Sequence, residues 1–139
     1  MIAYFDTSAI VPLVISEPTS ATAQRLWTEA ERLVSVRLAY PEARAALAQG
    51  QRMGRIDPRE LRKAVISLEE LIDQIDIIEL TADLARDAGD LAERRGLRGY
   101  DAVHLAAALA LRDAELVVVA TDRALCEAAA IEHLSVAHL

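Results

Sequence analysis

Four acidic residues of this chain stand where an expected strand ends or an expected helix begins. Asp6 and Asp122 follow the two most apolar strands, whereas Glu42 and Asp101 occupy the first turns of two helices. They are separated by 36, 59 and 21 residues. Helices that follow the strands of an open parallel sheet begin at the carboxyl edge of that sheet, so all four side chains could gather at one edge.

Four carboxylates in one place would either bind protons or need a cation close by. Two carboxylates about 5 Å apart repel each other by roughly 3 kcal/mol at an effective dielectric constant near 20. Hard oxygen ligands that leave positions open for water suit Mg²⁺ or Mn²⁺. Such an ion lowers the pKa of a bound water and bridges to a phosphate oxygen. The pattern therefore predicts hydrolysis of a phosphodiester.

Each of these acids also has a purely structural interpretation. The helix dipole favours acids in the first helical turn, which alone would explain Glu42 and Asp101. Asp6 could belong to a turn or a helix cap, and Asp122 could be a simple N-cap. The chemical interpretation therefore depends on all four acids being present together.

The opening stretch, Ile2 to Phe5, is expected to position the first acid. Its residues are apolar and favour β-structure, and they are followed by Asp6 and two hydroxyl residues, Thr7 and Ser8. We expect a buried strand that ends at Asp6, with Thr7 or Ser8 capping the next helix. A strand that is apolar on both faces belongs in a parallel sheet covered by helices.

The rest of the chain alternates between expected strands and helices. Further strands are expected at 34–36, 76–80, 115–120 and 134–136, and helices at about 19–33, 40–53, 59–74, 82–95, 102–111 and 123–130. This alternation predicts a three-layer α/β/α fold with a central, mainly parallel sheet. We find no internal boundary and no repeat at a fixed period, so residues 1–139 are expected to form a single domain.

The composition indicates a globular cytoplasmic protein. Hydrophobic residues make up 53% of the chain, with only five Gly and four Pro, which argues against disorder. The longest apolar runs fall far below the roughly 18 to 20 residues that span a membrane, and the start shows no signal-peptide pattern. The single cysteine, Cys126, excludes an intrachain disulfide framework and fits a reducing compartment.

The chain resembles the PIN-domain family, and within it the VapC-type toxins of bacterial and archaeal toxin–antitoxin pairs. The resemblance extends over nearly the whole chain and is carried by four ordered motifs: Asp6-Thr7-Ser8-Ala9, Tyr40-Pro41-Glu42-Ala43, Tyr100-Asp101-Ala102-Val103-His104 and Thr121-Asp122-Arg123. It implies a PIN-like domain that acts as a metal-dependent endoribonuclease. It also implies a homodimer that a cognate antitoxin holds inactive.

The acids receive roles from this chemistry. The three predicted ligands of Mg²⁺ or Mn²⁺ are Asp6, Asp101 and Asp122, bound directly or through water. Glu42 would complete the shell or orient the attacking water. Ser8 and Thr121 could hydrogen-bond the acids or the scissile phosphate, or they could cap helices. The number of metal ions stays open.

Basic residues are candidates for contacts with RNA. The net charge of −7 argues against nonspecific polyanion binding by the whole surface, but it permits a local basic face. The best candidate for such a face runs from Arg44 to Lys63, with six basic residues against two acids. It could equally be a solvated helix pair or a surface for the antitoxin. The three arginines predicted to contact substrate phosphate are Arg44, Arg98 and Arg123.

Other classes of protein fit the residues less well. An aspartyl phosphatase of the haloacid dehalogenase type would need a second Asp two residues after Asp6, where Ser8 stands. A phosphoacceptor receiver domain would need a Lys after a late strand, and the one lysine is Lys63. A catalytically silent PIN-like scaffold that binds RNA or protein stays open as the alternative. His104 is expected to be packed or hydrogen-bonded rather than a metal ligand.

Overall fold

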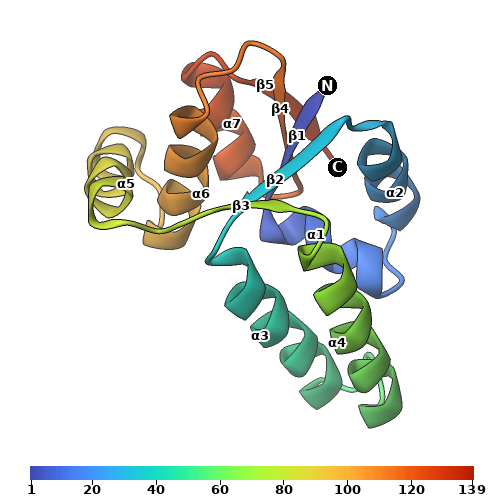
Figure 1. Ribbon diagram of the computed structural model, residues 1–139. Coiled ribbons are helices and arrows are strands. Elements are labelled where there is room, and N and C mark those ends of the chain that lie inside the picture. Colours follow the sequence, from blue (N-terminus) through green and yellow to red (C-terminus); the bar gives the residue numbers. More distant parts are fainter.

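The computed structural model describes all 139 residues as a parallel β-sheet covered by helices on both faces (Figure 1). The strand order is β3-β2-β1-β4-β5, and every neighbouring pair is parallel. The predicted α/β/α fold is confirmed. The elements are β1 (Ile2–Phe5), α1 (Thr7–Val14), α2 (Ser20–Glu29), β2 (Arg32–Val36), α3 (Ala39–Arg52), α4 (Pro58–Ile72), β3 (Asp76–Ile78), α5 (Ala82–Arg95), α6 (Gly99–Ala110), β4 (Leu116–Ala120), α7 (Arg123–Ile131) and β5 (Ser135–His138).

The strand β1 lies at the centre of the sheet, paired with β2 on one side and β4 on the other. Its residues Ala3, Tyr4 and Phe5 are completely buried. Tyr4 packs into the core on one face of the sheet, and Ala3 and Phe5 pack into the core on the other, as the alternation of side chains along a strand requires. The sequence correctly indicated a strand that is buried on both faces.

A separate hydrophobic core lies on each face of the sheet, and each core is covered by its own layer of helices. Helices α5, α6 and α7 cover the face that Tyr4 reaches, and α1, α2, α3 and α4 cover the other. Helix α6 is packed between the sheet and α5, which explains why nearly all of its residues are apolar. None of the helices combines the length and the apolar character needed to cross a membrane.

Helices α3 and α4 form an antiparallel hairpin that projects away from the sheet (Figure 1). Leu47 of α3 and Leu68 of α4 are fully buried in the core on that face. The turn between the helices uses Gly54 at a φ of 75°, a conformation that favours glycine. Asp57 then starts α4 with a capping box, so the far end of the hairpin is firmly defined.

The predicted end of one helix and the predicted cap of another were wrong. The helix expected through residue 33 ends at Glu29, since Arg32 already pairs with Ile2 in the sheet. The predicted cap of the first helix was also misassigned. Asp6 itself caps α1 by accepting a hydrogen bond from the backbone N–H of Ser8 at 3.1 Å.

Glu132, at the end of α7, connects this helix to the end of α5. Its Oε1 accepts hydrogen bonds from Arg94 Nη2 at 2.9 Å and from Arg95 Nε at 2.8 Å. Burial raises the pKa of the Glu132 carboxyl, but the hydrogen bonds and charges of the two arginines outweigh burial and lower it overall. The ion pair therefore contributes stability above the ordinary carboxyl pKa and loses it as the pH falls through the lowered value.

We expect Glu132→Gln to lower the free energy of unfolding by about 0.5 to 1 kcal/mol at pH 7. The difference from the unaltered protein should shrink as the pH falls below the ordinary glutamate pKa of about 4.3 and through the lowered pKa of the native carboxyl. Urea denaturation between pH 3 and pH 7 measures both values. Glu70→Gln, at an exposed position of α4, is the control and should show no such dependence. A loss that is constant with pH would contradict this explanation.

Candidate active site

The structure brings the four predicted acids together at the carboxyl edge of the sheet. Asp6 directly follows β1 and Asp122 follows β4, which are neighbouring strands. Glu42 and Asp101 come from the first turns of α3 and α6. All four side chains line one cavity of about 360 Å³.

The cavity also lies at the topological switch point of the sheet, between β1 and β4. From β1 the chain adds β2 and β3 on one side, and it later adds β4 and β5 on the other side. Helices after β1 and β4 therefore diverge onto opposite faces and leave a crevice between them. Open α/β sheets bind their ligands at such a switch point.

The acids lie at different depths in the cavity. Asp6 and Asp101 are each only 5% exposed, whereas the side chains of Glu42 and Asp122 are 23% and 28% exposed. Burial raises the pKa of the Asp101 carboxyl. The ion pair with Arg98 opposes this, but the nearby charges of Asp122 and Asp6 add to it, so the net pKa is raised. The cavity thus concentrates negative charge.

Ser8 connects the two strand ends that carry Asp6 and Asp122. Its hydroxyl donates to Asp6 Oδ2 at 2.5 Å and accepts the backbone N–H of Thr121 at 2.9 Å. Asp122 also caps α7 by accepting from the N–H of Leu125 at 2.9 Å, so its structural interpretation is confirmed, and its chemical role stays a prediction. Thr121 contributes through its backbone, and its hydroxyl bonds neither an acid nor a helix N–H. A contact of this hydroxyl with the scissile phosphate stays a prediction.

Arg98 bridges two of the acids. Its Nε donates to Asp101 Oδ2 at 3.0 Å and its Nη2 donates to Asp122 Oδ2 at 3.1 Å. Its guanidinium also lies over the ring of Tyr100, 4.7 Å from the ring centroid, in a cation–π contact. The arginine predicted to contact substrate phosphate therefore lines the cavity but is paired with the acids.

The other two predicted substrate-binding arginines lie outside the cavity. Arg123 pairs with Glu127 one turn along α7. Arg44 donates to the hydroxyl of Tyr40 at 2.7 Å and lies over its ring. The single lysine, Lys63, lies on the hairpin and does not line the cavity, which removes the phosphatase and receiver interpretations.

His104 is buried and hydrogen-bonded, as expected, and the sequence did not show that two of the acids are its partners. It is 1% exposed, and its Nε2 lies 2.6 Å from Glu42 Oε1 and 3.3 Å from Asp6 Oδ1. On the other side of the ring, Nδ1 lies 2.9 Å from the hydroxyl of Tyr4. The available signal was its position three residues after Asp101, on the same side of the helix.

The surroundings of His104 favour its charged form. Burial of the ring lowers the pKa of His104, but the hydrogen bond to Glu42 and the charges of Asp6, Glu42 and Asp101 outweigh it, so the net pKa is raised. In the contact with Glu42, Nε2 is the donor, because an ionised carboxylate can only accept. The pKa of the buried Tyr4 hydroxyl is raised well above its usual value, so this group stays a neutral phenol.

The donor set suits a hard divalent cation, but it is not a finished coordination shell. Carboxylate oxygens from four elements surround one cavity, as Mg²⁺ or Mn²⁺ would require. No group of three His, Cys, Asp or Glu side chains is already placed to hold an ion. Instead, Arg98 and His104 supply the positive charge. Binding a metal therefore requires at least the Arg98 side chain to move.

Comparisons with known proteins agree with this geometry. The model of the PIN domain matches residues 3–131. The ribonuclease VapC49 of Mycobacterium tuberculosis is 46% identical over 122 residues, which cover 88% of this chain and 85% of that protein.

Solved structures share the fold. The M. tuberculosis toxin VapC20, described as cleaving the sarcin-ricin loop, aligns with a TM-score of 0.69 and 21% identity, covering 91% of this chain and 94% of that one. A toxin–antitoxin complex from Klebsiella pneumoniae aligns with a TM-score of 0.62 and 19% identity, covering 86% of both chains.

We expect His104→Leu to lower the free energy of unfolding by about 2 to 3 kcal/mol at pH 7 in EDTA. Leucine fills the space of the imidazole ring, but it leaves Asp6 and Glu42 facing each other without a compensating charge. His133→Asn is the control, because His133 is exposed and its φ of 65° is one that Asn tolerates. Urea denaturation measures both. Equal losses in the two variants would show that the buried imidazole does not hold the acids.

Proposed function

The chain belongs to the PIN-domain family, and we propose that it is an endoribonuclease toxin that cleaves cellular RNA by metal-dependent phosphodiester hydrolysis and that a cognate antitoxin neutralises. VapC ribonucleases of this family are generally metal-dependent. The observation that carries the proposal is the meeting of four carboxylates in one cavity, two of them 5% exposed. Burying charged groups costs free energy, and a hydrophobic core alone gives no reason for it.

In this proposal, three acids hold the cation and the fourth orients the attacking water. Asp6, Asp101 and Asp122 would hold Mg²⁺ or Mn²⁺, directly or through water. The bound cation would lower the pKa of a water molecule and neutralise charge on the phosphate. The three acids come from β1, α6 and the end of β4, so the rigid sheet edge fixes their spacing.

Glu42 is suited to orient the attacking water and to accept its proton. His104 Nε2 and the hydroxyl of Thr7 both donate to Oε1 of Glu42, at 2.6 Å and 2.9 Å. Its Oε2 has no hydrogen bond within the protein and remains for a water. Tyr4 holds the other side of the imidazole, so a buried chain of contacts positions Glu42.

Arg98 would have two positions in this scheme. With Asp101 and Asp122 it forms ion pairs that neutralise the acids. When a cation takes this place, the 61% exposed guanidinium side chain can turn outward and contact the RNA backbone.

The remaining parts of the proposal concern assembly and location. We take residues 1–139 as one domain that forms a homodimer in the cytoplasm and binds an antitoxin protein. A catalytically silent scaffold is the second candidate. It is favoured by one observation, the existing pairing of Asp101 and Asp122 with Arg98.

We expect Asp6→Asn and Asp101→Asn each to reduce RNA cleavage by at least about a hundredfold, because each removes a proposed metal ligand. EDTA should abolish cleavage by the unaltered protein, and added Mg²⁺ or Mn²⁺ should restore it. The measurement is incubation of the purified, antitoxin-free protein with total RNA, with circular dichroism to verify folding. Asp87→Asn, an exposed change on α5, should leave cleavage intact. Absence of any cleavage with metal present would favour the scaffold.

We expect Arg98→Ala to bind Mn²⁺ about three- to fivefold more tightly than the unaltered protein, since the guanidinium competes for the same carboxylates. Calorimetric titration without RNA at pH 8 measures this affinity. Arg112→Ala removes the same charge from an arginine that has no carboxylate partner, and should leave the affinity unchanged. A weaker affinity in Arg98→Ala would show that this arginine supports the metal site instead of competing with it.

A further inference from the structure

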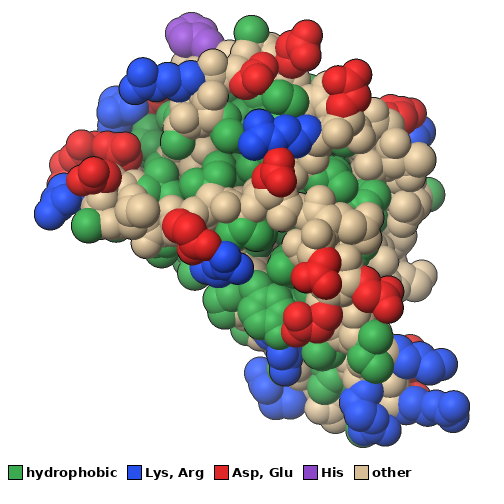
Figure 2. Space-filling view, in the orientation of Figure 1, with side chains coloured by type: hydrophobic (Ala, Val, Ile, Leu, Met, Phe, Trp, Pro, Cys, Tyr) green, Lys and Arg blue, Asp and Glu red, His purple; other side chains and the backbone are tan.

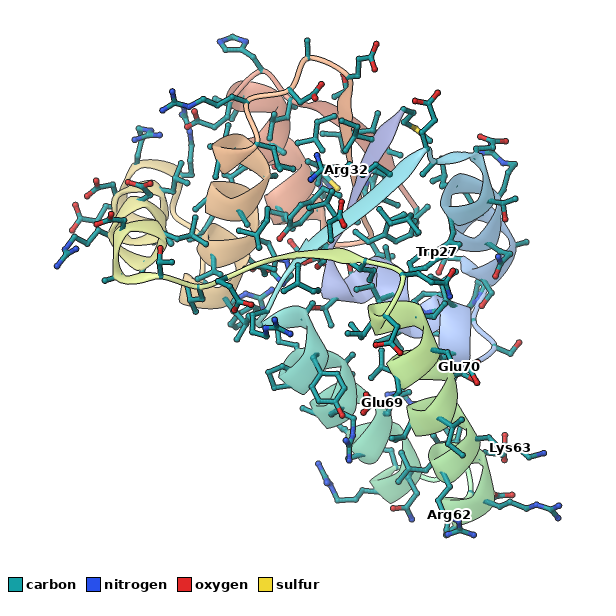
Figure 3. All side chains as sticks on the ribbon, viewed as in Figure 1. Trp27, Arg32, Arg62, Lys63, Glu69 and Glu70 are labelled. Atoms are coloured by element: carbon teal, nitrogen blue, oxygen red, sulfur yellow. The ribbon has the colours of Figure 1, made fainter.

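The far end of the α3–α4 hairpin carries a dense group of basic side chains. We call this group the basic tip; it consists of Arg52, Arg55, Arg59, Arg62 and Lys63. All five are exposed. Figure 2 shows blue side chains gathered at the lower end of the molecule, and in Figure 3 Arg62 and Lys63 extend away from α4.

The basic tip differs from the other basic residues because its charges are unpaired. Eight of the ten basic residues elsewhere in the chain have a carboxylate oxygen within 4 Å. None of the five residues of the basic tip has one. Arginines used only for solubility or helix stability would be expected to form ion pairs here as they do elsewhere.

The two acids within the tip do not cancel this charge. Asp57 accepts the backbone N–H of Glu60 at 2.8 Å, and Glu60 Oε1 accepts the backbone N–H of Asp57 at 3.2 Å. Both carboxylates are therefore directed at the start of α4. The rest of the chain contains ten basic and twenty acidic residues, so the tip is a positive pole on an otherwise acidic protein.

The basic tip has a fixed position relative to the acidic cavity. Helix α3 runs without interruption from Glu42, in the cavity, to Arg52 in the tip. Ten residues of α-helix span about 15 Å. A second hollow of about 400 Å³ is lined by Arg55, Lys63 and Ser16, and the next residue, Glu17, lines the acidic cavity.

From these observations we propose that the basic tip binds the phosphate backbone of the RNA substrate, on nucleotides that flank the phosphate to be cut. This inference depends on the proposed ribonuclease function. A polyanion is repelled by an acidic cavity on a protein of net charge −7, so an attractive surface at a distance must bring it there. Contacts with phosphates carry no sequence information, so the tip would add affinity without selecting bases.

The test compares two double variants that remove the same charge. Arg59→Gln with Arg62→Gln alters the basic tip, and Arg25→Gln with Arg86→Gln alters exposed, ion-paired positions on α2 and α5. Binding to a 20-nucleotide single-stranded RNA is measured by fluorescence anisotropy in EDTA, where cleavage cannot interfere. Arg55→Gln with Lys63→Gln repeats the test at other positions of the tip.

The tip variants should bind this RNA about tenfold more weakly than the control. The slope of log affinity against log salt should fall by about 1.4 for two lost phosphate contacts on a single strand. With metal present, KM for the same RNA should rise while kcat stays unchanged, and cleavage of a dinucleotide, which cannot span about 15 Å, should be unaffected.

Three results would overturn the inference. Equal RNA affinity in the tip and control variants would show that the tip does not touch the backbone. Loss of antitoxin binding with unchanged RNA affinity would identify the tip as a protein-binding surface. A lower kcat with unchanged RNA affinity would show that the tip affects the cleavage step and not RNA binding. Failure of the unaltered protein to cut RNA would instead refute the ribonuclease proposal, because binding is measured separately in EDTA.

Discussion

The structure depends on giving every acid at the buried edge of its hydrophobic sheet a partner that compensates for the lost water. Removing an ion from water costs several kcal/mol unless another group compensates. Here each acid has such a group: Ser8 for Asp6, His104 for Glu42, and Arg98 for Asp101 and Asp122. These partners compensate the negative charge, and Arg98 would have to leave Asp101 and Asp122 before an external cation could replace it.

The order of the strands explains why these partners are available. Because β1 pairs with β4, the residues after the two strands meet although more than a hundred positions separate them. Helix α6 brings Asp101 and His104 to the same place from one layer, and α3 brings Glu42 from the other. The site therefore exists only when both layers are packed on the sheet, and folding and site formation are one event.

The sequence alone predicted those features of the fold that depend on hydrophobic periodicity and on the residues that start or end helices and strands. The apolar strands, the alternation with helices and the position of Asp6 after β1 could all be read locally. The pairing of Tyr4 with His104, 100 residues apart, could not, because a buried tyrosine and a buried histidine have no pattern that specifies a partner. The same limit applies to Arg98: nothing local distinguishes an arginine that bridges two acids from one that faces solvent. The roles of the four acids themselves stay predictions.

The basic tip and the acidic cavity differ in how strongly dissolved salt screens their charges. Monovalent salt screens exposed charges over about 8 to 10 Å at physiological strength, but it screens buried groups far less. The basic tip is exposed, so its proposed attraction for RNA would weaken as salt rises. Asp6 and Asp101 are 5% exposed, so their demand for a cation persists. The proposed capture of a polyanion at the tip and the charge compensation in the cavity would thus be independent interactions, held at a fixed separation by helix α3.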